Sequence, residues 1–460
     1  MKFPTTFPIA CHTDFVGPGS TFVAIKGYQS NGMIFIPRAI EKGATTIVVE
    51  DDQDITPYAD VLKNISVVTV PDARKALAEL SAHAAGYPAK KLSIIGITGT
   101  KGKTTTAYLL DHILKKAGYN RALLTTVKNS INSAAFPAPL TTPQPDYLHQ
   151  FFKLCVNEGV THVVMEVAAQ AIPMYRIHGI EFSGIIFSNF GQEHLEFFDS
   201  MDSYFAAKQK LFDYRKKDAP IWINSDDAMI APLKDQYSQV KTFGVDSLAD
   251  ITMADDSHII IDGQKYELHN PSLPGLYNRY NTMAAIGIAY SLGIEMPKIQ
   301  NALKSFLGIP GRLERYLLPN GAIAIIDYAH NPLSYQALLP VLREKTDHLI
   351  VVFGAGGERD PSRRPHMGAI AAQYADEVII TSDNPRREDP QSIIDDILSG
   401  IKDRSSVICE IDRERAIQIA YTHAHKNTII ALLGKGPDEY QIVGTTKTYF
   451  SEQAILQSFL

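Results

Sequence analysis

The sequence is poor in cysteine and has no large excess of charge of one sign. Its three cysteines, Cys11, Cys155 and Cys409, lie far apart along 460 residues, which excludes a disulfide framework and argues for a reducing compartment. No two of them have zinc-finger spacing. Lysine and arginine number 44 against 50 acidic residues, giving a net charge of −6. A nucleic-acid partner, which would favour a basic domain, is therefore not expected.

Long apolar runs are absent as well. No stretch approaches the roughly 18 uninterrupted apolar residues of a membrane span, and the first residues do not form the apolar core of a secretory signal. With 45% hydrophobic and 20% charged residues, the composition is that of an ordinary globular protein. We therefore expect a cytoplasmic chain of about two to four domains.

Short β-branched runs alternate with helical stretches along the whole chain. Clear examples are residues 46–49, 94–97, 162–165, 323–326, 349–353 and 428–433. This alternation predicts an α/β protein with mostly parallel sheets covered by helices. Turn-forming segments near residues 87–91 and 308–311 divide the chain into three predicted domains, 1–88, 89–308 and 309–460.

The strongest local signal is a glycine-rich loop between a strand and a helix. The apolar run 94–97 leads into Gly99-Thr100-Lys101-Gly102-Lys103-Thr104-Thr105, and helical spacing follows. Glycine amides and a helix N-terminus bind phosphate, Lys103 would reach the outer phosphates, and the Thr104 hydroxyl would ligate Mg²⁺. Ile97 stands where the general Walker spacing requires glycine, so the loop has a variant form.

Three further residues are candidates for the same site. Glu166 ends the apolar run 162–165, and a carboxylate at the end of a parallel strand suits Mg²⁺. His194 follows the apolar run 185–187, and Lys208 lies on a predicted helix. Taken alone, His194 would more often be a structural histidine, and Lys208 would more often be an exposed lysine on a helix.

Taken together, these segments resemble the Mur ligase family, the ATP-dependent ligases that build the cell-wall peptide stem. The resemblance spans almost the whole chain and is strongest from about residue 91 to residue 441. It implies a UDP-binding domain, a central domain binding ATP and Mg²⁺, and a C-terminal Rossmann-like domain that brings an amino acid. Within the family, the chain is most similar to the branch that adds the third amino acid to UDP-N-acetylmuramoyl-L-alanyl-D-glutamate.

The resemblance implies roles for individual residues. Lys103, Glu166, His194, Lys208 and Arg312 would form the catalytic set, with Mg²⁺ held by Thr104, Glu166, His194 and Lys208 as a carbamate. ATP would be bound by residues 99–105, Asn281, Arg312 and Asp327, and the sugar nucleotide by Thr141, Thr142 and Arg176. The amino acid would meet Arg364, Asp383, Asn384, Arg386, Gly434 and Asp438.

Residues 383–386, Asp-Asn-Pro-Arg, resemble the tetrad of family members that select meso-diaminopimelate. Arg386 can hold the distal carboxylate bidentately, a group that L-lysine lacks. Lys101 and Gln170 instead resemble lysine-adding members. We weight Arg386 more, because it would contact the feature that distinguishes the two amino acids, and L-lysine stays an alternative.

Several segments depart from the family pattern. His12-Thr13-Asp14 replaces a uridine-side Asp-Ser-Arg, Ala168-Ala169 lacks hydroxyls expected near the sugar nucleotide, and Asp438 is shorter than the expected glutamate. A paralogue acting on a non-murein carboxylate is therefore a second alternative, and a non-enzymatic ATP-binding scaffold is a third.

The implied chemistry is amide ligation through an acyl phosphate. ATP would phosphorylate the acceptor carboxylate, and the amine of the incoming amino acid would displace phosphate. The expected cofactors are ATP and Mg²⁺ with a carbamylated Lys208. The expected partners are small molecules only, and the protein is expected to act as a monomer.

Overall fold

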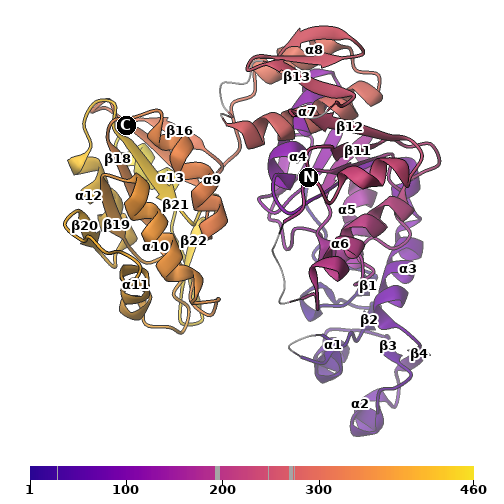
Figure 1. Ribbon diagram of the computed structural model, residues 1–460. Coiled ribbons are helices and arrows are strands. Elements are labelled where there is room, and N and C mark those ends of the chain that lie inside the picture. Colours follow the sequence, from indigo (N-terminus) through magenta and orange to yellow (C-terminus); the bar gives the residue numbers. More distant parts are fainter. Residues whose placement is uncertain (28–29, 192–196, 247, 269–272, 274) are drawn as a thin grey trace. The chain divides into compact units, whose positions relative to one another are not determined.

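The computed structural model covers residues 1–460 and describes all of them except 28–29, 192–196, 247, 269–272 and 274. The chain divides into two compact units. The first holds Met1–Asn270 and Leu276–Phe306, and the second holds Pro271–Gly275 and Leu307–Leu460. The described residues form three α/β sheets and one short hairpin (Figure 1). The predicted α/β class with three layered sheets is confirmed.

The N-terminal sheet of the first unit is entirely parallel. Its strands are β1 (Ile9–Ala10), β2 (Thr21–Val23), β3 (Thr46–Glu50) and β4 (Ser66–Val70), in that order. The helices between and after them are α1 (Ile36–Glu41), α2 (Ala59–Leu62) and α3 (Ala73–Ala85). Asp72 caps α3 by accepting the Lys75 N–H at 2.9 Å, and α3 packs against both this sheet and helix α5 (Pro145–Asn157).

The central sheet is parallel in its middle and antiparallel at both ends. Its order is β15-β14-β13-β12-β11-β10-β5-β9-β6-β7-β8. The middle strands are β5 (Ser93–Thr98), β6 (Arg121–Leu124), β9 (His162–Glu166), β10 (Gly184–Phe187), β11 (Ile221–Asn224), β12 (Val240–Gly244) and β13 (Ile251–Asp255). The outer strands are β7 (Asn129–Ile131), β8 (Ala134–Phe136), β14 (His258–Ile261) and β15 (Gln264–Glu267). Residues 94–98 are fully buried because helices cover both faces.

The helices of this part pack around the middle strands. They are α4 (Lys103–Lys116), α5, α6 (Met201–Gln209), α7 (Leu276–Ser291) and α8 (Met296–Lys304). Leucines and isoleucines at helical spacing bury the inner face of α4, and α4 packs against α7 and α8 (Figure 1). Short 3-10 helices complete the unit at residues 13–15, 32–35, 56–58, 88–91, 169–171, 210–214 and 231–235.

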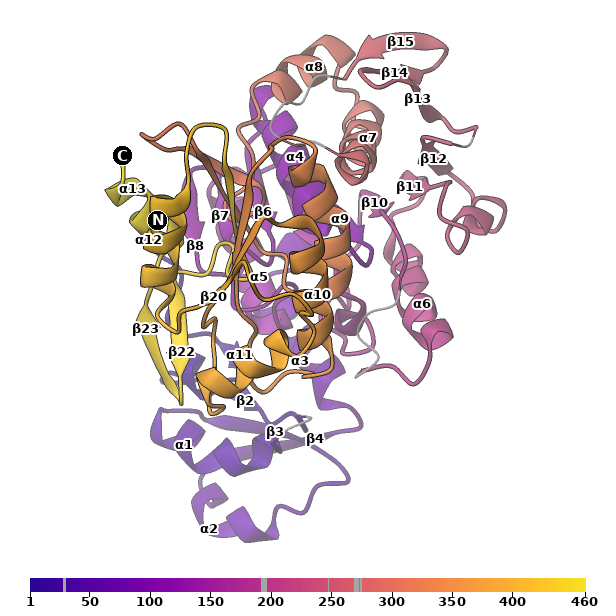
Figure 2. The same cartoon turned by 60° about the vertical axis from the view of Figure 1, so that its left-hand side comes forward.

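The second unit is a Rossmann-like layer structure. Its sheet has the order β16 (Glu314–Leu317), β17 (Ile323–Asp327), β21 (Ile429–Leu433), β18 (Leu349–Phe353), β19 (Glu377–Ile380), β20 (Val407–Cys409), and only β16 is antiparallel to its neighbour. One face is covered by α9 (Pro332–Arg343), α10 (Arg363–Tyr374) and α11 (Pro390–Leu398), and the other by α12 (Arg413–His423) and α13 (Glu452–Ser458) (Figure 2). A hairpin of β22 (Tyr440–Val443) and β23 (Thr446–Tyr449) follows β21.

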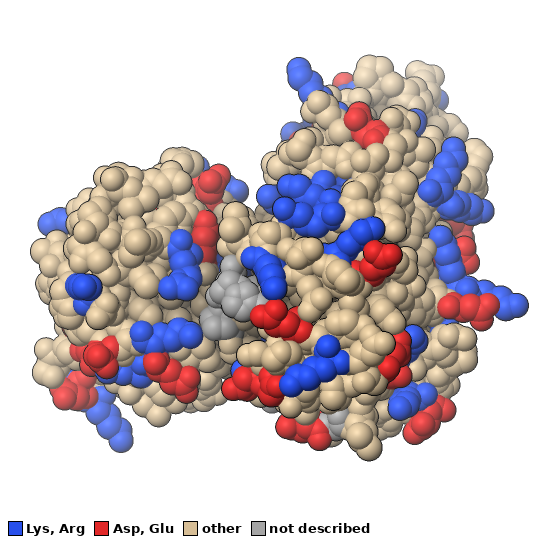
Figure 3. Space-filling view, turned by 90° about the horizontal axis from the view of Figure 1, so that it is seen from above, with Lys and Arg blue, Asp and Glu red and all other residues tan. Residues whose placement is uncertain are grey.

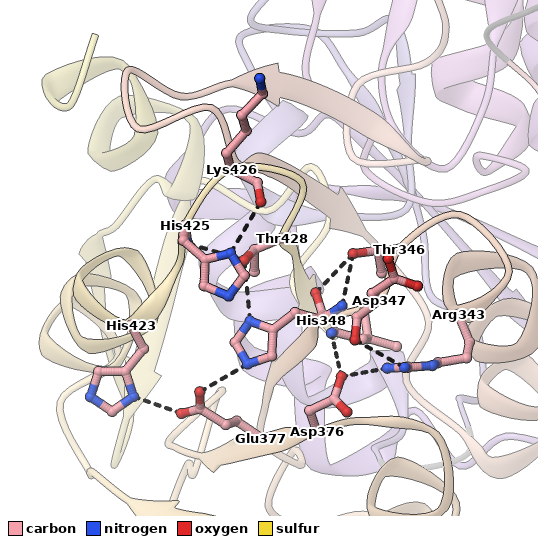
Figure 4. A network of polar contacts seen from close by, with 11 residues as sticks. Arg343, Thr346, Asp347, His348, Asp376, Glu377, His423, His425, Lys426 and Thr428 are labelled. Carbon is pink, nitrogen blue, oxygen red and sulfur yellow. Dashed lines mark hydrogen bonds and ion pairs between the residues drawn. The ribbon is translucent and has the colours of Figure 1, made fainter.

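The two ends of this sheet differ in their polar groups. At the amino ends of β18, β19 and β21, Glu377 lies 3.2 Å from His348 and accepts from His423, and the rings of His348 and His425 stack at 4.8 Å (Figure 4). At the carboxyl ends lie Asp327 and the loops that follow Phe353, Ile380 and Leu433, brought together by the parallel register. In open α/β sheets, ligands bind outside the carboxyl ends.

Basic and acidic side chains are interspersed on the face seen in Figure 3, as the near-balanced composition suggests. Among the described residues, no helix is long and apolar enough to cross a membrane.

Candidate active site

The glycine-rich loop after β5 requires glycine at two positions. Gly99 has φ +148° and Gly102 has φ +81°, which are conformations that favour glycine. A Cβ on Gly99 would lie 2.0 Å from Ser188 Oγ, and a Cβ on Gly102 would lie 2.1 Å from Asn281 Oδ1. The loop therefore fits its surroundings only without side chains at Gly99 and Gly102.

The loop is held from the end of the neighbouring strand β10. Asn189 O accepts the Thr100 N–H at 2.9 Å, and Asn189 Oδ1 accepts the Lys101 N–H at 2.8 Å. Helix α4 begins directly behind the loop, and its N-cap Gly102 provides no capping side chain. The first turn of α4, with Thr104 and Thr105, therefore presents the amide end of a helix to a phosphate. The sequence reasoning did not single out Asn189.

Two lysines predicted from separate segments meet at this loop. Lys103 Nζ donates to Gly99 O at 2.8 Å and to Thr100 O at 3.0 Å. Lys208, from α6, donates to the same Gly99 O at 2.8 Å and lies 4.7 Å from the centre of the Tyr204 ring. Lys208 is only 1% exposed, so it is not an ordinary exposed lysine on a helix.

Glu166 ends β9 beside the loop and is oriented by one threonine. The Thr126 N–H donates to Glu166 Oε1 at 3.1 Å, and the Thr126 hydroxyl donates to Oε2 at 3.2 Å. Thr126 Oγ1 also lies 3.0 Å from Thr141 Oγ1. Both carboxylate oxygens are therefore fixed by a residue that also touches the Thr141-Thr142 turn. Thr126 was missed because nothing in its local sequence marks it.

The residues expected to hold Mg²⁺ match its ligand preference in kind. Thr104 offers a hydroxyl, Glu166 a carboxylate and Lys208, once carbamylated, a second pair of oxygens, which are the hard donors that Mg²⁺ prefers. His194 lies at 192–196, outside the described residues. Within the described ranges no group of three or more His, Cys, Asp and Glu could hold a metal, as expected for a set with one native carboxylate.

The predicted sugar-nucleotide residues form a connected turn. Thr142 is buried, donates through its hydroxyl to Glu166 O at 2.9 Å and accepts the Ala168 N–H at 2.9 Å. Arg176 donates to Thr142 O at 3.0 Å. Hydrogen bonds thus link the turn to the end of β9 and to Arg176. Ala168 has no side-chain hydroxyl and takes part in this network only through its backbone N–H.

A cavity of about 460 Å³ lies beside this turn in the first unit. Its lining combines two arginines, one histidine and several aromatic rings, and it comes from both the N-terminal sheet and the central part. The lining residues include Cys11, His12, Phe15, Phe35, Arg74, Leu140, Asp146, Tyr147 and Arg176. Cationic and aromatic groups together suit a ligand that carries phosphates and a base.

The wall of this cavity contains a buried pair that the sequence reasoning missed. Asp146 is 2% exposed and accepts the Cys11 N–H at 3.0 Å. Burial raises the pKa of the Asp146 carboxyl, and burial together with Asp146 raises the pKa of the Cys11 thiol. The two residues are 135 positions apart, so no local pattern could have paired them.

Asn281, expected at the adenine, lies against the phosphate loop. It is 4% exposed, its Oδ1 accepts from the Thr106 hydroxyl at 3.4 Å, and its amide donates to Asn278 at 3.3 Å. Its contact with Gly102 helps shape the loop, and its adenine contact stays a prediction.

In the second unit, Arg312 and Asp327 are neighbours. The Arg312 guanidinium lies 4.7 Å from the centre of the Tyr328 ring. Asp327 ends β17 and accepts the N–H groups of Leu313 and Ala329, each at 2.8 Å. Burial raises the pKa of Asp327, while Arg312 opposes that shift.

Arg364, predicted as a second cation for the amino acid, is held by the chain's own carboxylates. It is 2% exposed and pairs with Glu388 and Asp396, each at 2.8 Å. Arg364 also donates to Gly356 O, in the loop after β18, at 3.4 Å, and Arg359 and Arg386 flank the same glycine. Arg359 is a cation that the sequence reasoning did not assign.

The tetrad 383–386 is pinned by the hairpin strand β22. Gln441 donates to Asp383 O at 2.9 Å, the Ile442 N–H donates to Asn384 Oδ1 at 2.9 Å, and Ile442 O accepts the Arg386 N–H at 3.1 Å. Arg386 has φ +53° and donates from its guanidinium to Gly357 O.

Gly434 and Asp438 lie on the loop after β21, next to this tetrad. A Cβ on Gly434 would lie 3.0 Å from Asp383 Oδ2, so a side chain there would press on that carboxylate. Asp438 is half-buried, which raises its pKa against the opposing effect of Lys435.

Comparison with known proteins agrees with this geometry. Residues 9–85 match the model described as "Mur ligase family, catalytic domain", residues 97–289 the Mur ligase middle domain, and residues 311–436 the "Mur ligase, glutamate ligase domain". A UDP-N-acetylmuramoyl-L-alanyl-D-glutamate–2,6-diaminopimelate ligase of Caldanaerobacter subterraneus subsp. tengcongensis is 38% identical over 455 residues, covering 96% of this chain and 92% of the relative. A ligase of the same name from Phocaeicola vulgatus is 35% identical over 452 residues, with 96% and 92% covered.

Solved structures extend the comparison to the fold. A structure of a UDP-N-acetylmuramoyl-L-alanyl-D-glutamate–2,6-diaminopimelate ligase superposes with TM-score 0.67 at 26% identity, covering 98% of this chain and 94% of the other. A folylpolyglutamate synthase from Thermotoga maritima, at 17% identity and TM-score 0.61 over 77% of this chain and 89% of the other, shares the fold. The family models, the relatives above 30% identity and the layered sheets together establish that this chain belongs to the Mur ligase family.

Proposed function

We propose that this chain joins meso-diaminopimelate to the D-glutamate γ-carboxylate of UDP-N-acetylmuramoyl-L-alanyl-D-glutamate, with hydrolysis of ATP to ADP and phosphate. The observation that carries the proposal is the convergence of Lys103, Lys208 and Glu166 at a phosphate loop. The relatives named above supply the substrate names, since each is named for this reaction.

The phosphate loop would hold the ATP phosphates, with Lys103 moving from the Gly99 carbonyl to the phosphate oxygens. The acceptor carboxylate and the triphosphate are both anionic, so their approach requires cations. When bound, Mg²⁺ supplies charge neutralisation between these anions. Thr104, Glu166, His194 and carbamylated Lys208 are the residues that would hold it.

The cavity that contains Arg176 would bind the sugar nucleotide. It lies next to Leu140, and so next to the Thr141-Thr142 turn that is hydrogen-bonded to Glu166. A ligand in this cavity could extend its peptide toward the metal residues along that turn.

Arg386 and Asp383 would receive the incoming amino acid. The Arg386 guanidinium suits the distal carboxylate, and the carboxylate of Asp383 suits an amino group. Because the reaction uses ATP, we propose that it takes place in the cytoplasm. We also propose that the protein acts as a monomer, so that one chain supplies every site.

A ligation assay with purified protein tests the proposal. ADP release and product mass are measured with UDP-N-acetylmuramoyl-L-alanyl-D-glutamate and, in separate reactions, meso-diaminopimelate, L-lysine and no amino acid. A diaminopimelate tripeptide product is expected. A lysine product would instead support the lysine-adding alternative.

The departures at His12-Thr13-Asp14 and Ala168-Ala169 favour a second candidate, a ligase for a different carboxylate acceptor. Binding of ATP with no turnover of the murein dipeptide by any amino acid would favour that candidate. Absence of ATP binding would contradict both.

A further inference from the structure

Several buried polar atoms of the second unit have no hydrogen-bond partner within the described residues. Among the residues that the structure describes there, these atoms are Arg312 Nε, Tyr335 Oη, Arg363 Nε, Arg364 Nε, Asp383 Oδ1 and Glu452 Oε2. Tyr335, Arg363 and Glu452 each interact electrostatically with Asp383. Native proteins rarely leave such atoms unpaired, and Asp383 is a charged neighbour that these three residues share.

Lys435 lies beneath Asp383 and has no exposed surface. Its Nζ is 3.6 Å from Asp383 Oδ1 and 3.5 Å from Asn384 Oδ1. The rings of Tyr440 and Phe450 complete its surroundings, each with its centre 5.6 Å from Nζ. A buried ammonium is costly unless an opposite charge compensates it, and Asp383 is the carboxylate nearest to it in the described contacts.

Two more buried charges extend this pair into an alternating set. Arg413, the first residue of α12, lies 2.8 Å from Glu452, the first residue of α13. Arg413 also donates to Leu433 O at 2.8 Å and to Ser382 O at 3.5 Å, the backbone positions just before Gly434 and Asp383. Glu452, Arg413, Asp383 and Lys435 therefore alternate in sign and sum to zero.

The charged groups that face Lys435 are Asp383, Arg413, Asp438 and Glu452. Of the three carboxylates in this group, Asp383 belongs to the tetrad 383–386 and lies beside Gly434. Lys435 lies on the Oδ1 side of this carboxylate, which leaves Oδ2, the oxygen beside Gly434, to accept a hydrogen bond from an amino group.

We propose that Lys435 is a positioning residue that holds Asp383 so that its free side is directed at the amino group of the incoming amino acid. This inference rests on the proposed function, because it assumes an amino acid at Asp383. Lys435 is not among the residues predicted above to bind the amino acid. In this proposal it acts through Asp383 and does not contact the substrate.

Lys435→Met tests the proposal through amino-acid kinetics. We expect KM for meso-diaminopimelate to rise by about tenfold or more at pH 7, and KM for ATP to change less than about twofold. A merely structural role for Lys435 would lower stability or kcat without raising KM for the amino acid selectively over KM for ATP.

Lys426→Met is the matched control. Lys426 precedes β21 at the opposite end of the strand, and its ammonium points away from the His348 network (Figure 4). It should leave both KM values unchanged. If Lys435→Met instead behaves like this control, the proposal is wrong.

A double variant covers the case in which Lys435→Met does not fold. Asp383→Asn/Lys435→Met removes both charges and should be more stable than Asp383→Asn alone, because the single variant leaves the buried Lys435 ammonium without its nearest carboxylate. In Asp383→Asn, loss of Lys435 should add no further increase in KM. Equal loss of folding in the single and double variants would mean that Lys435 acts by packing, which contradicts the proposal.

Failure of the proposed function would be visible separately. If the wild-type enzyme ligates a different amino acid, the same comparison is made with that one, since every candidate carries an amino group. If it ligates none, binding of meso-diaminopimelate and L-lysine is compared by calorimetry for wild type and Lys435→Met. Equal affinities of the two proteins would overturn the positioning role.

Discussion

Lys103 and Lys208 donate hydrogen bonds to one carbonyl oxygen, that of Gly99, each at 2.8 Å. Two ammonium groups on a shared acceptor repel each other, most strongly where water is excluded, and Lys208 is almost fully buried. Addition of CO₂ to Lys208 would replace that repulsion with attraction to Lys103. The carbamate on Lys208 stays a prediction that the family resemblance implies.

Lys208→Ala should lower kcat by about 100-fold or more, because it removes the carbamate that is expected to help hold Mg²⁺ between the two anionic substrates. A short carboxylic acid such as formate should restore part of the activity by filling the space. The readout is ligation rate against formate concentration, with ¹³C NMR of the wild-type protein in ¹³CO₂ to detect the carbamate. Normal activity in the variant, or no carbamate signal, would contradict the expectation.

Lys103→Ala should abolish ligation and weaken ATP binding while leaving the fold intact. Its side chain contacts loop carbonyls rather than the core, so the expected loss is in phosphate binding. Equilibrium binding of ATP and circular dichroism measure the two effects. Lys116→Ala, at the other end of α4, is the matched control, and near-normal turnover of Lys103→Ala would remove the phosphate-loop assignment.

Arg386→Ala should reduce kcat/KM for meso-diaminopimelate by about 100-fold, the size expected for a lost bidentate carboxylate contact. Loss of use of L-lysine should be much smaller, because L-lysine has no distal carboxylate. Both values are measured in one assay, with the neighbouring exposed Arg387→Ala as control. An equal loss for both amino acids would remove the specificity argument.

His149 should make the first unit sensitive to acid. It lies on α5, is 1% exposed, and neither ring nitrogen has a hydrogen-bond partner in the part of the chain that the structure describes. Burial lowers its pKa to about 4. The unfolded chain takes up a proton below about pH 6.5 that the native state refuses, so stability falls between about pH 6.5 and 4.

The expected loss from His149 is about 3 kcal/mol by pH 4, at 1.36 kcal/mol per pKa unit. His149→Leu should flatten this part of the dependence of the unfolding free energy on pH, as measured by urea denaturation. His366→Leu, on an exposed position, should not. A slope in His149→Leu identical to that of wild type would show that other groups cause the acid sensitivity.

The buried Arg413–Glu452 pair should matter for stability rather than for binding. Arg413→Met leaves Glu452 buried without its partner and should cost about 3 to 5 kcal/mol of unfolding free energy. Arg413→Met/Glu452→Leu should recover much of that loss, because neither charge remains. Denaturation of the three proteins measures the cycle, and equal losses in the single and double variants would contradict charge compensation.

Local sequence determined the elements and the phosphate loop. The apolar run 94–97 is a fully buried strand, and the glycines at 99 and 102 occupy conformations and contacts that exclude side chains. These features depend on neighbours in the chain, so pattern and residue type suffice to predict them. The resemblance to a family supplied roles for distant residues that local chemistry alone would not have assigned.

Only the tertiary structure decided which distant groups share an environment. Parallel register brings the carboxyl ends of β5, β6, β9 and β10 together. Thr126 therefore contacts Glu166, and Asn189 contacts the phosphate loop. The same packing pairs Arg364 with Glu388 and Asp396, and it buries Lys435 beside Asp383. Side-chain pairing between residues 24 or more positions apart, as in these examples, depends on sheet order and burial, which a single sequence does not encode in any local pattern.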